Sequence, residues 1–342
     1  MAYFSENLTI LVAKVETVPG TPATITSADF DFKVFNPTIT MSVEANDEQA
    51  KYANGNHSED VAVMGIQSGT IAFTLNLAKG ANNYTAPKWA KFAYGAGLSP
   101  VSYTGIGWGL QPLKAYDEKP LTMWVYKLKR GPTPTATCFK FSGCMGTLNI
   151  TGEGTGKPVI LNFSYSGKLV DIDFDVANAS IPEINNLDET CYERLLGTSI
   201  EIDGIERQCD TFDLDTGNEI SPLKDMGQDT GIDFYGITKR NPRLTCDPLM
   251  IGATGTVPTD YAYIYGSATG CPSTPTISIN TPHWTVTMPK CQLSTLTPGG
   301  RDGLSNFSQT WRLLGNGYTG VLTDTGLPGE CTFEMLQGTK TY

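Results

Sequence analysis

The sequence predicts an all-β protein built from two similar β units, and two observations lead to this fold class. First, 40% of the 342 residues are hydrophobic and only 17% are charged, while 36 glycines and 21 prolines supply the turns that many short strands need. Second, the order of elements in the first half returns in the second half. Repetition of one β unit indicates a building block more than a single catalytic pocket.

Both halves end on a matched pair of strands, with a glycine-rich turn between the pair. Alternation of polar and apolar residues at period two marks these strands, as it does in any half-buried sheet. We expect the closing strands at 138–144, 147–150 and 159–167 in the first half, and at 283–288, 291–296 and 306–311 in the second. The order of elements, and not residue identity, carries the repeat.

The remaining elements of the first half are strands and one helix. The strands are expected at 8–13, 30–35, 38–43, 61–64, 70–77 and 121–128. The helix follows residue 77, because Thr85 can cap its start, Pro87 fits its first turn, and Gly95 and Gly97 stop it. Its apolar face would consist of Trp89, Phe92 and Ala93.

A polar stretch over 178–192 lacks periodicity and is expected to link a first unit, 1–177, to a second unit, 193–342. Strands of the second unit are expected at 199–202, 209–214, 232–237 and 243–246. For residues 261–265 the sequence leaves two structures open, a strand and a short helix. Alternation of tyrosine with small residues favours a strand there, whereas position in the repeat favours a short helix.

Charge and cysteine usage exclude several classes of function. The net charge of −11 and the pI near 4.7 argue against a tightly held nucleic acid, because such sites neutralise phosphate with lysine and arginine. The N-terminus lacks the pattern of a secretory signal, and no segment is apolar enough to span a membrane. No zinc-type spacing joins the cysteines at 138, 144, 191, 209, 246, 271, 291 and 331. Because the sequence shows no export signal, we expect reduced, mostly buried thiols, and disulfides formed later, outside a cell, stay open as the alternative.

Patterns that are typical of enzymes are explained better by turns. Asp-Thr-Gly occurs at 215–217, 229–231 and 324–326, but an aspartic protease needs two such loops from matching lobes. The first two copies share one loop, and the first half has none. His57 and His283 have no neighbouring serine or cysteine in a known nucleophile context.

Two further patterns resemble ligand sites without matching them. The acidic run from Asp210 to Glu219 lacks the glycine and glutamate spacing of an EF-hand, so a solvated hairpin is the expected structure. Gly152, Gly154 and Gly156 precede no helix and predict a turn between strands. The sequence therefore predicts no catalytic residue, no cofactor and no metal.

Short motifs at both ends of the chain resemble the tail tube (major tail) proteins of long-tailed bacteriophages. Residues 12–22, Val-Ala-Lys-Val-Glu-Thr-Val-Pro-Gly-Thr-Pro, are similar to the opening strand and loop of that family. Residues 288–293, followed by Asp302 and Gly303, are similar to its closing strands. The resemblance, which covers nearly the whole chain, implies β-sandwich units, each with a short flanking helix and a long hairpin loop.

The resemblance also implies a function, as a subunit of stacked rings whose inner sheets merge around a channel for genome delivery. Two units per chain imply trimeric, pseudo-hexameric rings. The implied partners are further copies of the chain and other tail proteins, namely the tape measure, distal tail and terminator proteins. Phage DNA would pass an acidic lumen without specific binding. The implied location is the virion tail, after synthesis and assembly in the cytoplasm of the host bacterium.

Two polar loops, 44–60 and 215–231, are the expected contacts between stacked rings, because loops this long in compact domains are usually functional or disordered. The candidate contact residues are Glu44, Asp47, Glu48, Lys51, Tyr52, His57, Glu59, Asp60, Asp215, Asn218, Glu219, Lys224 and Asp225. Two alternatives stay open. One is a distal tail or baseplate ring protein. The other is a carbohydrate-binding β-sandwich, which would stack sugars on Trp108, Trp284, Tyr103 and Tyr318.

Overall fold

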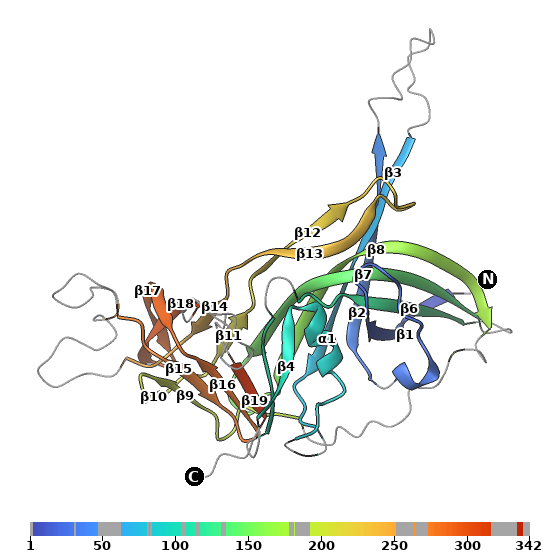
Figure 1. Ribbon diagram of the computed structural model, residues 1–342. Coiled ribbons are helices and arrows are strands. Elements are labelled where there is room, and N and C mark those ends of the chain that lie inside the picture. The colour runs from blue at the N-terminus through green and yellow to red at the C-terminus, as the bar shows by residue number, and fades with distance from the viewer. Residues whose placement is uncertain are drawn as a thin grey trace, which may run out of the picture.

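The chain is mostly β, as the sequence predicts, and its strands are antiparallel wherever they pair (Figure 1). The computed structural model describes residues 3–30, 32–46, 63–80, 82, 84–103, 107–113, 117–130, 135–177, 181, 192–250, 263, 273–315 and 334–337. No helix within these ranges is long and apolar enough to cross a membrane.

A ten-stranded sheet contains strands from both halves of the chain. The first half contributes β1 (Tyr3–Val15), β2 (Phe35–Asn46), β3 (Val63–Asn76), β6 (Leu121–Arg130), β7 (Thr135–Gly152) and β8 (Val159–Ala177). The second half contributes β11 (Phe212–Asp215), β14 (Arg243–Cys246), β17 (Cys291–Arg301) and β18 (Leu304–Leu313). The order is β17-β18-β14-β11-β7-β8-β3-β2, with β6 beside β7 and β1 beside β6. The sheet therefore has free edges at β17, β2 and β1 among the described strands.

A seven-stranded sheet is also shared between the halves, in the order β10-β9-β15-β16-β19-β5-β4. Its strands are β4 (Leu98–Tyr103), β5 (Gly107–Pro112), β9 (Ser199–Ile202), β10 (Ile205–Arg207), β15 (Ile277–Asn280), β16 (Trp284–Met288) and β19 (Glu334–Gln337). The other described elements are the hairpin of β12 (Asn218–Lys224) and β13 (Ile232–Arg240), a 3-10 turn, η1 (Ser27–Asp29), and the helix α1 (Ala90–Gly95).

One core of buried side chains runs through both halves. The ring of Trp284, from the second half, lies 5.8 Å from that of Trp89 and 6.2 Å from that of Trp108. The helix α1 adds Phe92, whose ring packs edge-on against Phe73 of β3 at 4.9 Å. Because strands and core cross from one half to the other, the division into 1–177 and 193–342 stays a prediction of the sequence.

The predicted closing pairs are confirmed as the hairpins β7–β8 and β17–β18, and the glycine-rich stretch 153–158 is the turn of the first. The helix is confirmed, with its apolar face buried, but it begins later than predicted. Thr85 does not cap it, because its hydroxyl donates to the side-chain oxygen of Asn82 at 2.9 Å. Of the open segment 261–265, only Tyr263 is described, and its ring packs 5.4 Å from that of Trp311.

Two expectations about local structure are wrong. Phe30 and residues 32–34 are not in a strand, because the buried rings of Phe30 and Phe32 pack against Tyr126 and Phe92. The stretch 215–231 is not one loop, since 218–224 form β12 and pair with β13. Its polar residues suit a two-stranded hairpin that keeps one face in water.

Candidate assembly surfaces

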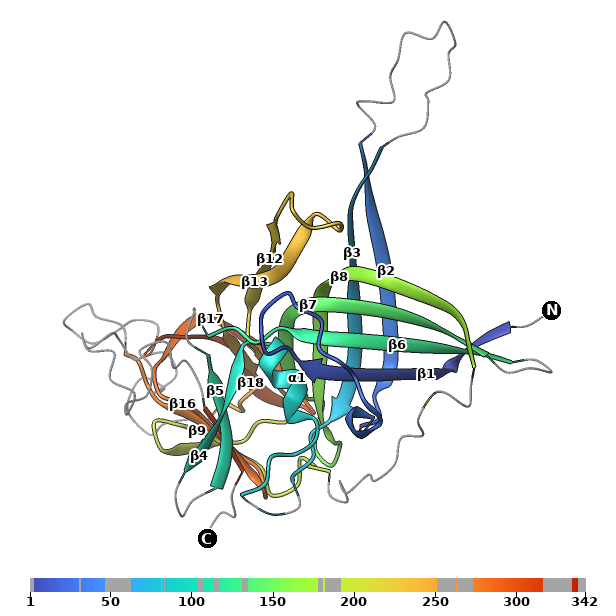
Figure 2. The ribbon, with the colours of Figure 1, turned by 45° about the vertical axis from the view of Figure 1, so that its right-hand side comes forward.

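A long arm formed by β2 and β3 leaves the body of the molecule (Figures 1 and 2). The arm is anchored at its base, where β3 pairs with β8 from Asn76 to Ser68. Beyond Ser68, the described partner of β3 within the sheet is β2 alone. The arm carries the exposed candidate Glu44 near its outer end. The other candidates of this loop, which are Asp47, Glu48, Lys51, Tyr52, His57, Glu59 and Asp60, lie outside the described residues.

One face of β2 carries an apolar stripe that extends beyond the core. Ile39, Met41 and Val43 alternate along the strand and so share this face. Ile39 packs against the core, whereas Met41 is 45% exposed and Val43 is 38% exposed. Apolar side chains along an unpaired sheet edge form a template for pairing with another chain.

The outer half of β8 shows the same pattern. Its pairing with β3 ends at Lys168, and from there to Ala177 its partner among the described strands is β7. Ile172 packs against the core, while Phe174, two residues further along the same face, is 72% exposed. The body therefore offers a second strand edge that no described strand pairs with, and this edge carries an exposed aromatic ring.

Carboxylates on the opposite face of this outer half are paired with lysines. The ammonium group of Lys140 lies 3.2 Å from the Asp171 carboxylate and 2.5 Å from that of Asp173. Its hydrogen bond holds the pKa of Asp171 below the usual value. Lys129 does the same for Asp175 at 2.7 Å. The two lysines therefore offset most, but not all, of the negative charge of the three carboxylates on this face.

The β12–β13 hairpin, unlike the arm, is fastened along the body. At its base the side-chain amide of Asn218 donates to the carbonyls of Ala96 at 2.8 Å and Gly146 at 2.9 Å. Further along, Ile232 and Tyr235 pack on Met145 of β7. Asn218, one of the candidate contact residues, is only 9% exposed. Its amide is used inside the chain.

The remaining candidates of this hairpin are divided between its two ends. At the base, Asp215 accepts a hydrogen bond from the backbone of Gly217, and Glu219 forms an exposed ion pair with Lys239 at 2.7 Å. At the tip, Lys224 and Asp225 are exposed. The tip also exposes two apolar side chains, Leu223 at 43% and Met226 at 104%.

The tip of the β12–β13 hairpin touches the stem of the arm (Figure 2). The backbone amide of Gln67 donates to the carbonyl of Thr230 at 3.3 Å, and Gly231 lies against Ile66. The fold therefore brings the stem that carries the described part of the first predicted contact segment, 44–46, against the tip of the second. The sequence predicted the two segments separately. No local pattern in the sequence indicates that the hairpin tip contacts the stem of the arm.

A buried carboxylate that sequence reasoning missed as a site, Glu16, ties the loop after β1 to the sheet. It accepts hydrogen bonds from the amides of Gly20 and Gly143 at 2.9 and 2.8 Å and from the Thr122 hydroxyl at 2.9 Å. The ammonium group of Lys168, also buried, donates to the carbonyl of Gly20 at 2.9 Å. Burial raises the pKa of the Glu16 carboxyl, and these hydrogen bonds offset part of that rise.

The same loop packs on the second hairpin. Gly20, at φ 79°, leaves no room for a Cβ beside Asp233 of β13, and Gly143, at φ 60°, leaves none beside Phe234. Glu16 and Gly20 belong to the Glu-Thr-Val-Pro-Gly stretch of the N-terminal motif. The N-terminal motif therefore contained the residues of this site. It did not indicate which groups elsewhere in the chain would hydrogen-bond to Glu16.

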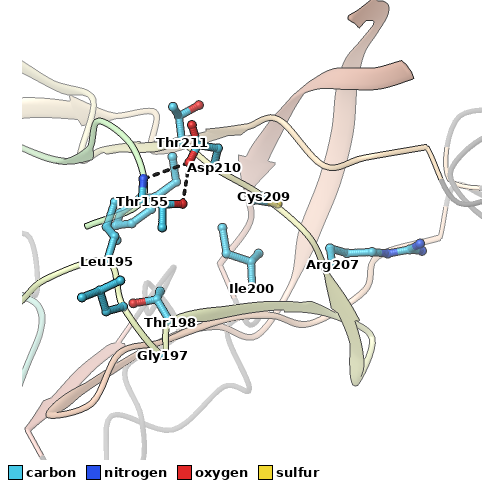
Figure 3. Close-up of a pocket in the computed structure, with 11 residues that line it drawn as sticks. Thr155, Leu195, Gly197, Thr198, Ile200, Arg207, Cys209, Asp210 and Thr211 are labelled. Atoms are coloured by element: carbon cyan, nitrogen blue, oxygen red, sulfur yellow. Dashed lines mark hydrogen bonds between the residues drawn. The ribbon is translucent and has the colours of Figure 1, made fainter. Parts of the chain in front are cut away.

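A small cavity of about 180 Å³ lies near the turn between β7 and β8 (Figure 3). At one end the backbone amide and hydroxyl of Thr155 donate to the Asp210 carboxylate at 2.9 and 2.7 Å, which lowers the pKa of Asp210. Arg207 extends away from the other labelled side chains (Figure 3). Pockets for drug-sized ligands are larger, about 300–1,000 Å³.

Other polar groups that the sequence singled out are placed as follows. His283 lies with Nδ1 2.5 Å from a buried carboxylate oxygen of Glu193, which orients its ring. Within the described ranges, no three His, Cys, Asp or Glu side chains are grouped to hold a metal ion. Of the described cysteines, Cys138, Cys144, Cys246 and Cys291 are buried, as predicted for most of the thiols, and Cys209 is partly exposed.

The carbohydrate alternative loses two of its aromatic residues. Trp108 is 6% exposed and Trp284 is 0% exposed, because the two rings pack against each other in the core. Of the other two, Tyr103 has no described side chain and Tyr318 lies outside the described residues. Stacking on a sugar needs an exposed ring, so the two tryptophans cannot provide it.

The fold and these surfaces define the chain as an all-β protein whose sheet edges lack a partner among the described strands and whose two hairpins lie on one side. Comparison with models of known families finds no match, and neither does comparison with curated proteins.

Proposed function

We propose that this protein is a structural subunit that associates with copies of itself, and more specifically a tail tube protein of a long-tailed phage. In this proposal the chain carries two β-sandwich units and forms trimeric, pseudo-hexameric rings, which stack around a channel for genome delivery. The observation that carries the proposal is the apolar face that continues past the core on β2 and β8, along strand edges without a described partner.

Physical chemistry favours a second copy as the cover of these edges. Unpaired backbone groups and apolar side chains on an edge favour aggregation unless another strand pairs with them. A ring satisfies every such edge with the same interface, since each subunit offers one edge and accepts the next. Covering the Phe174 ring, which is 72% exposed, would contribute about 1–2 kcal/mol, and covering Met41, which is 45% exposed, about 1 kcal/mol.

The two hairpins support the stacking part of the proposal. The arm and the tip of the β12–β13 hairpin lie on the same side of the molecule, so both can meet a neighbouring ring. Head-to-tail contacts that do not close on themselves produce filaments. Excess carboxylate, with a net charge of −11, would repel DNA phosphate from a lumen that it lines. DNA would then pass without being held.

The experiment is negative-stain electron microscopy of the purified protein at increasing concentration. We expect hollow rings or tubes with three-fold or six-fold class averages. Single rings that never stack would favour the distal tail or baseplate alternative. Monodisperse monomers at every concentration would contradict self-association altogether.

A matched pair of variants on β2 tests the surface itself. Met41→Lys places a charge on the apolar stripe, and we expect the concentration needed for assembly to rise about tenfold or more. Thr40→Lys adds the same charge to the neighbouring exposed residue on the other face, and we expect a smaller change. Equal loss of assembly in both variants would show that any added charge on the arm weakens association, whether or not it lies on the apolar stripe.

A further inference from the structure

A shallow depression of about 330 Å³ lies on the face of the ten-stranded sheet that is turned away from the core. It crosses four neighbouring strands, β2, β3, β8 and β7. The register of these strands places its side chains in two rows. One row consists of Thr38, Ala72, Ser164 and Thr147, which are cross-strand partners in that order. The other row contains Thr74, Asn162 and Asn149.

Two small side chains form the centre of this depression. Ala72 of β3 and Ser164 of β8 lie directly opposite each other, between the threonines at the two ends of their row. Neighbouring strands are about 4.8 Å apart, so a row across four strands is about 14 Å long. The depression is therefore long and open, and it suits a flat, extended ligand better than a compact one.

The polar side chains that line the depression are all uncharged among the described residues. They are hydroxyl groups of serine and threonine and side-chain amides of asparagine. An ionic ligand would lose its hydration here without gaining an opposite charge. Hydroxyl and amide groups both donate and accept hydrogen bonds, and so do the hydroxyl groups of a sugar. The chemistry of the lining therefore favours a neutral ligand that is rich in hydroxyl groups.

Several of these polar groups keep hydrogen-bonding capacity. The Asn162 amide donates to the Thr151 hydroxyl at 3.3 Å, while its oxygen has no partner within the described part of the chain. Ser164 is exposed, and its hydroxyl makes no hydrogen bond to a described residue. The side-chain oxygen of Asn149 is buried and also lacks a described partner. An acceptor in that position is costly to leave unpaired, and a ligand hydroxyl that reaches it would satisfy it.

An exposed aromatic ring stands at the edge of the second row. Phe35 of β2 is the direct cross-strand partner of Thr74, and such partners place their side chains on the same face of a sheet. The Phe35 ring is 49% exposed, whereas the adjacent Val34 packs against the core on the other face. An exposed ring beside hydrogen-bonding groups can stack on the apolar face of a sugar ring.

We propose that this depression binds a neutral oligosaccharide, with Asn149, Asn162 and Ser164 bonding its hydroxyl groups and Phe35 stacking on one of its rings. The site uses neither of the buried tryptophans, Trp108 and Trp284. Affinity is expected in the millimolar range, because an open depression leaves much of the ligand in water. The inference is independent of the proposed function, since pairing along the β2 edge uses backbone groups and leaves this face open.

The test is saturation-transfer NMR of the full chain with three neutral probes, maltotriose, mannotriose and triacetylchitotriose, each at up to about 20 mM. We expect transfer of saturation from the protein to at least one of them. A trigalacturonate probe, which carries carboxylates, should receive none. Silence from all three neutral probes would overturn the proposal. Transfer to trigalacturonate as strong as that to a neutral probe would overturn the neutral class of ligand.

Matched variants locate the binding. Ala72→Leu fills the centre of the depression, and Phe35→Ala removes an exposed ring on which the fold does not depend. We expect the dissociation constant to rise about tenfold in each. Thr245→Leu adds bulk to the same face on β14, outside the depression, and should bind like the wild type. Unchanged affinity in both Ala72→Leu and Phe35→Ala would place the binding elsewhere and overturn the proposal.

Discussion

The two hairpins on one side of the molecule are built in opposite ways. The arm of β2 and β3 is held by its base in the sheet, and its outer part is a two-stranded ribbon with exposed apolar side chains. The β12–β13 hairpin contacts the body at its base through Asn218 and further along through Ile232 and Tyr235, and its tip at Thr230 contacts the stem of the arm. An isolated two-stranded ribbon is only marginally stable in water. The second hairpin therefore acts as a brace for the stem of the first.

This difference separates two tasks. The brace contributes to the stability of the folded chain through buried contacts, so changes at its base should unfold it. The arm contributes little to folding beyond its base and presents surface instead, so changes there should alter association. The experiments that follow either break this distinction or make it quantitative.

The largest expected effect comes from Asn218→Asp. The substitution replaces a donor that bonds to the carbonyls of Ala96 and Gly146 with a buried negative charge facing both. We expect the free energy of unfolding to fall by about 3 kcal/mol, measured by urea denaturation. Glu219→Gln, one residue along, removes an exposed ion pair and should change stability by less than about 0.5 kcal/mol. Similar stability in the two variants would show that the base is not fastened.

A smaller effect, with a pH dependence, is expected from Glu16→Gln. The amide nitrogen cannot accept a hydrogen bond, so at least one of those from Gly20, Gly143 and Thr122 is lost, at a cost of about 1–3 kcal/mol. Burial raises the pKa of Glu16 in the folded protein above its ordinary value of 4.5, so the folded state binds this proton more tightly than the unfolded state.

The sign of the pH effect follows from that difference. The advantage of the wild type over Glu16→Gln is fully present below pH 4.5 and shrinks as the pH rises through the folded pKa. Urea denaturation of both proteins from pH 4 to 7 measures it. Glu153→Gln, at an exposed position, should follow the wild type at every pH. A gap that widens toward neutral pH would contradict the raised pKa.

The smallest expected effect comes from Gly231→Ala, at the contact between brace and arm. Gly231 has φ 73°, and an added Cβ would lie 3.0 Å from the side chain of Ile66. We expect a loss of about 1–2 kcal/mol and faster hydrogen exchange at the Gln67 amide, which bonds to the brace. Gly227→Ala, in the same turn, meets only ordinary contacts and serves as the control. Unchanged exchange at Gln67 would show that the brace does not hold the arm.

Much of the fold could be predicted from local sequence patterns. Little of the candidate assembly surface could be predicted in this way. Period-two alternation marked the strands of the closing hairpins, and the spacing of Trp89, Phe92 and Ala93 marked the helix. Polarity alone did not separate β12 from a loop. Polarity also placed Asn218 on the surface, because a buried amide is identified only by the carbonyls that it meets.

The sequence by itself determined that the chain is mostly β, where its closing hairpins turn, and that its charge is strongly acidic, since these depend on neighbours along the chain and on composition. Only the tertiary structure decided that β7 pairs with β11 and that β5 pairs with β19, across the two halves. It alone decided that the tip of the β12–β13 hairpin meets the stem of the arm. Such pairings depend on contacts between residues far apart in sequence, which local periodicity does not encode.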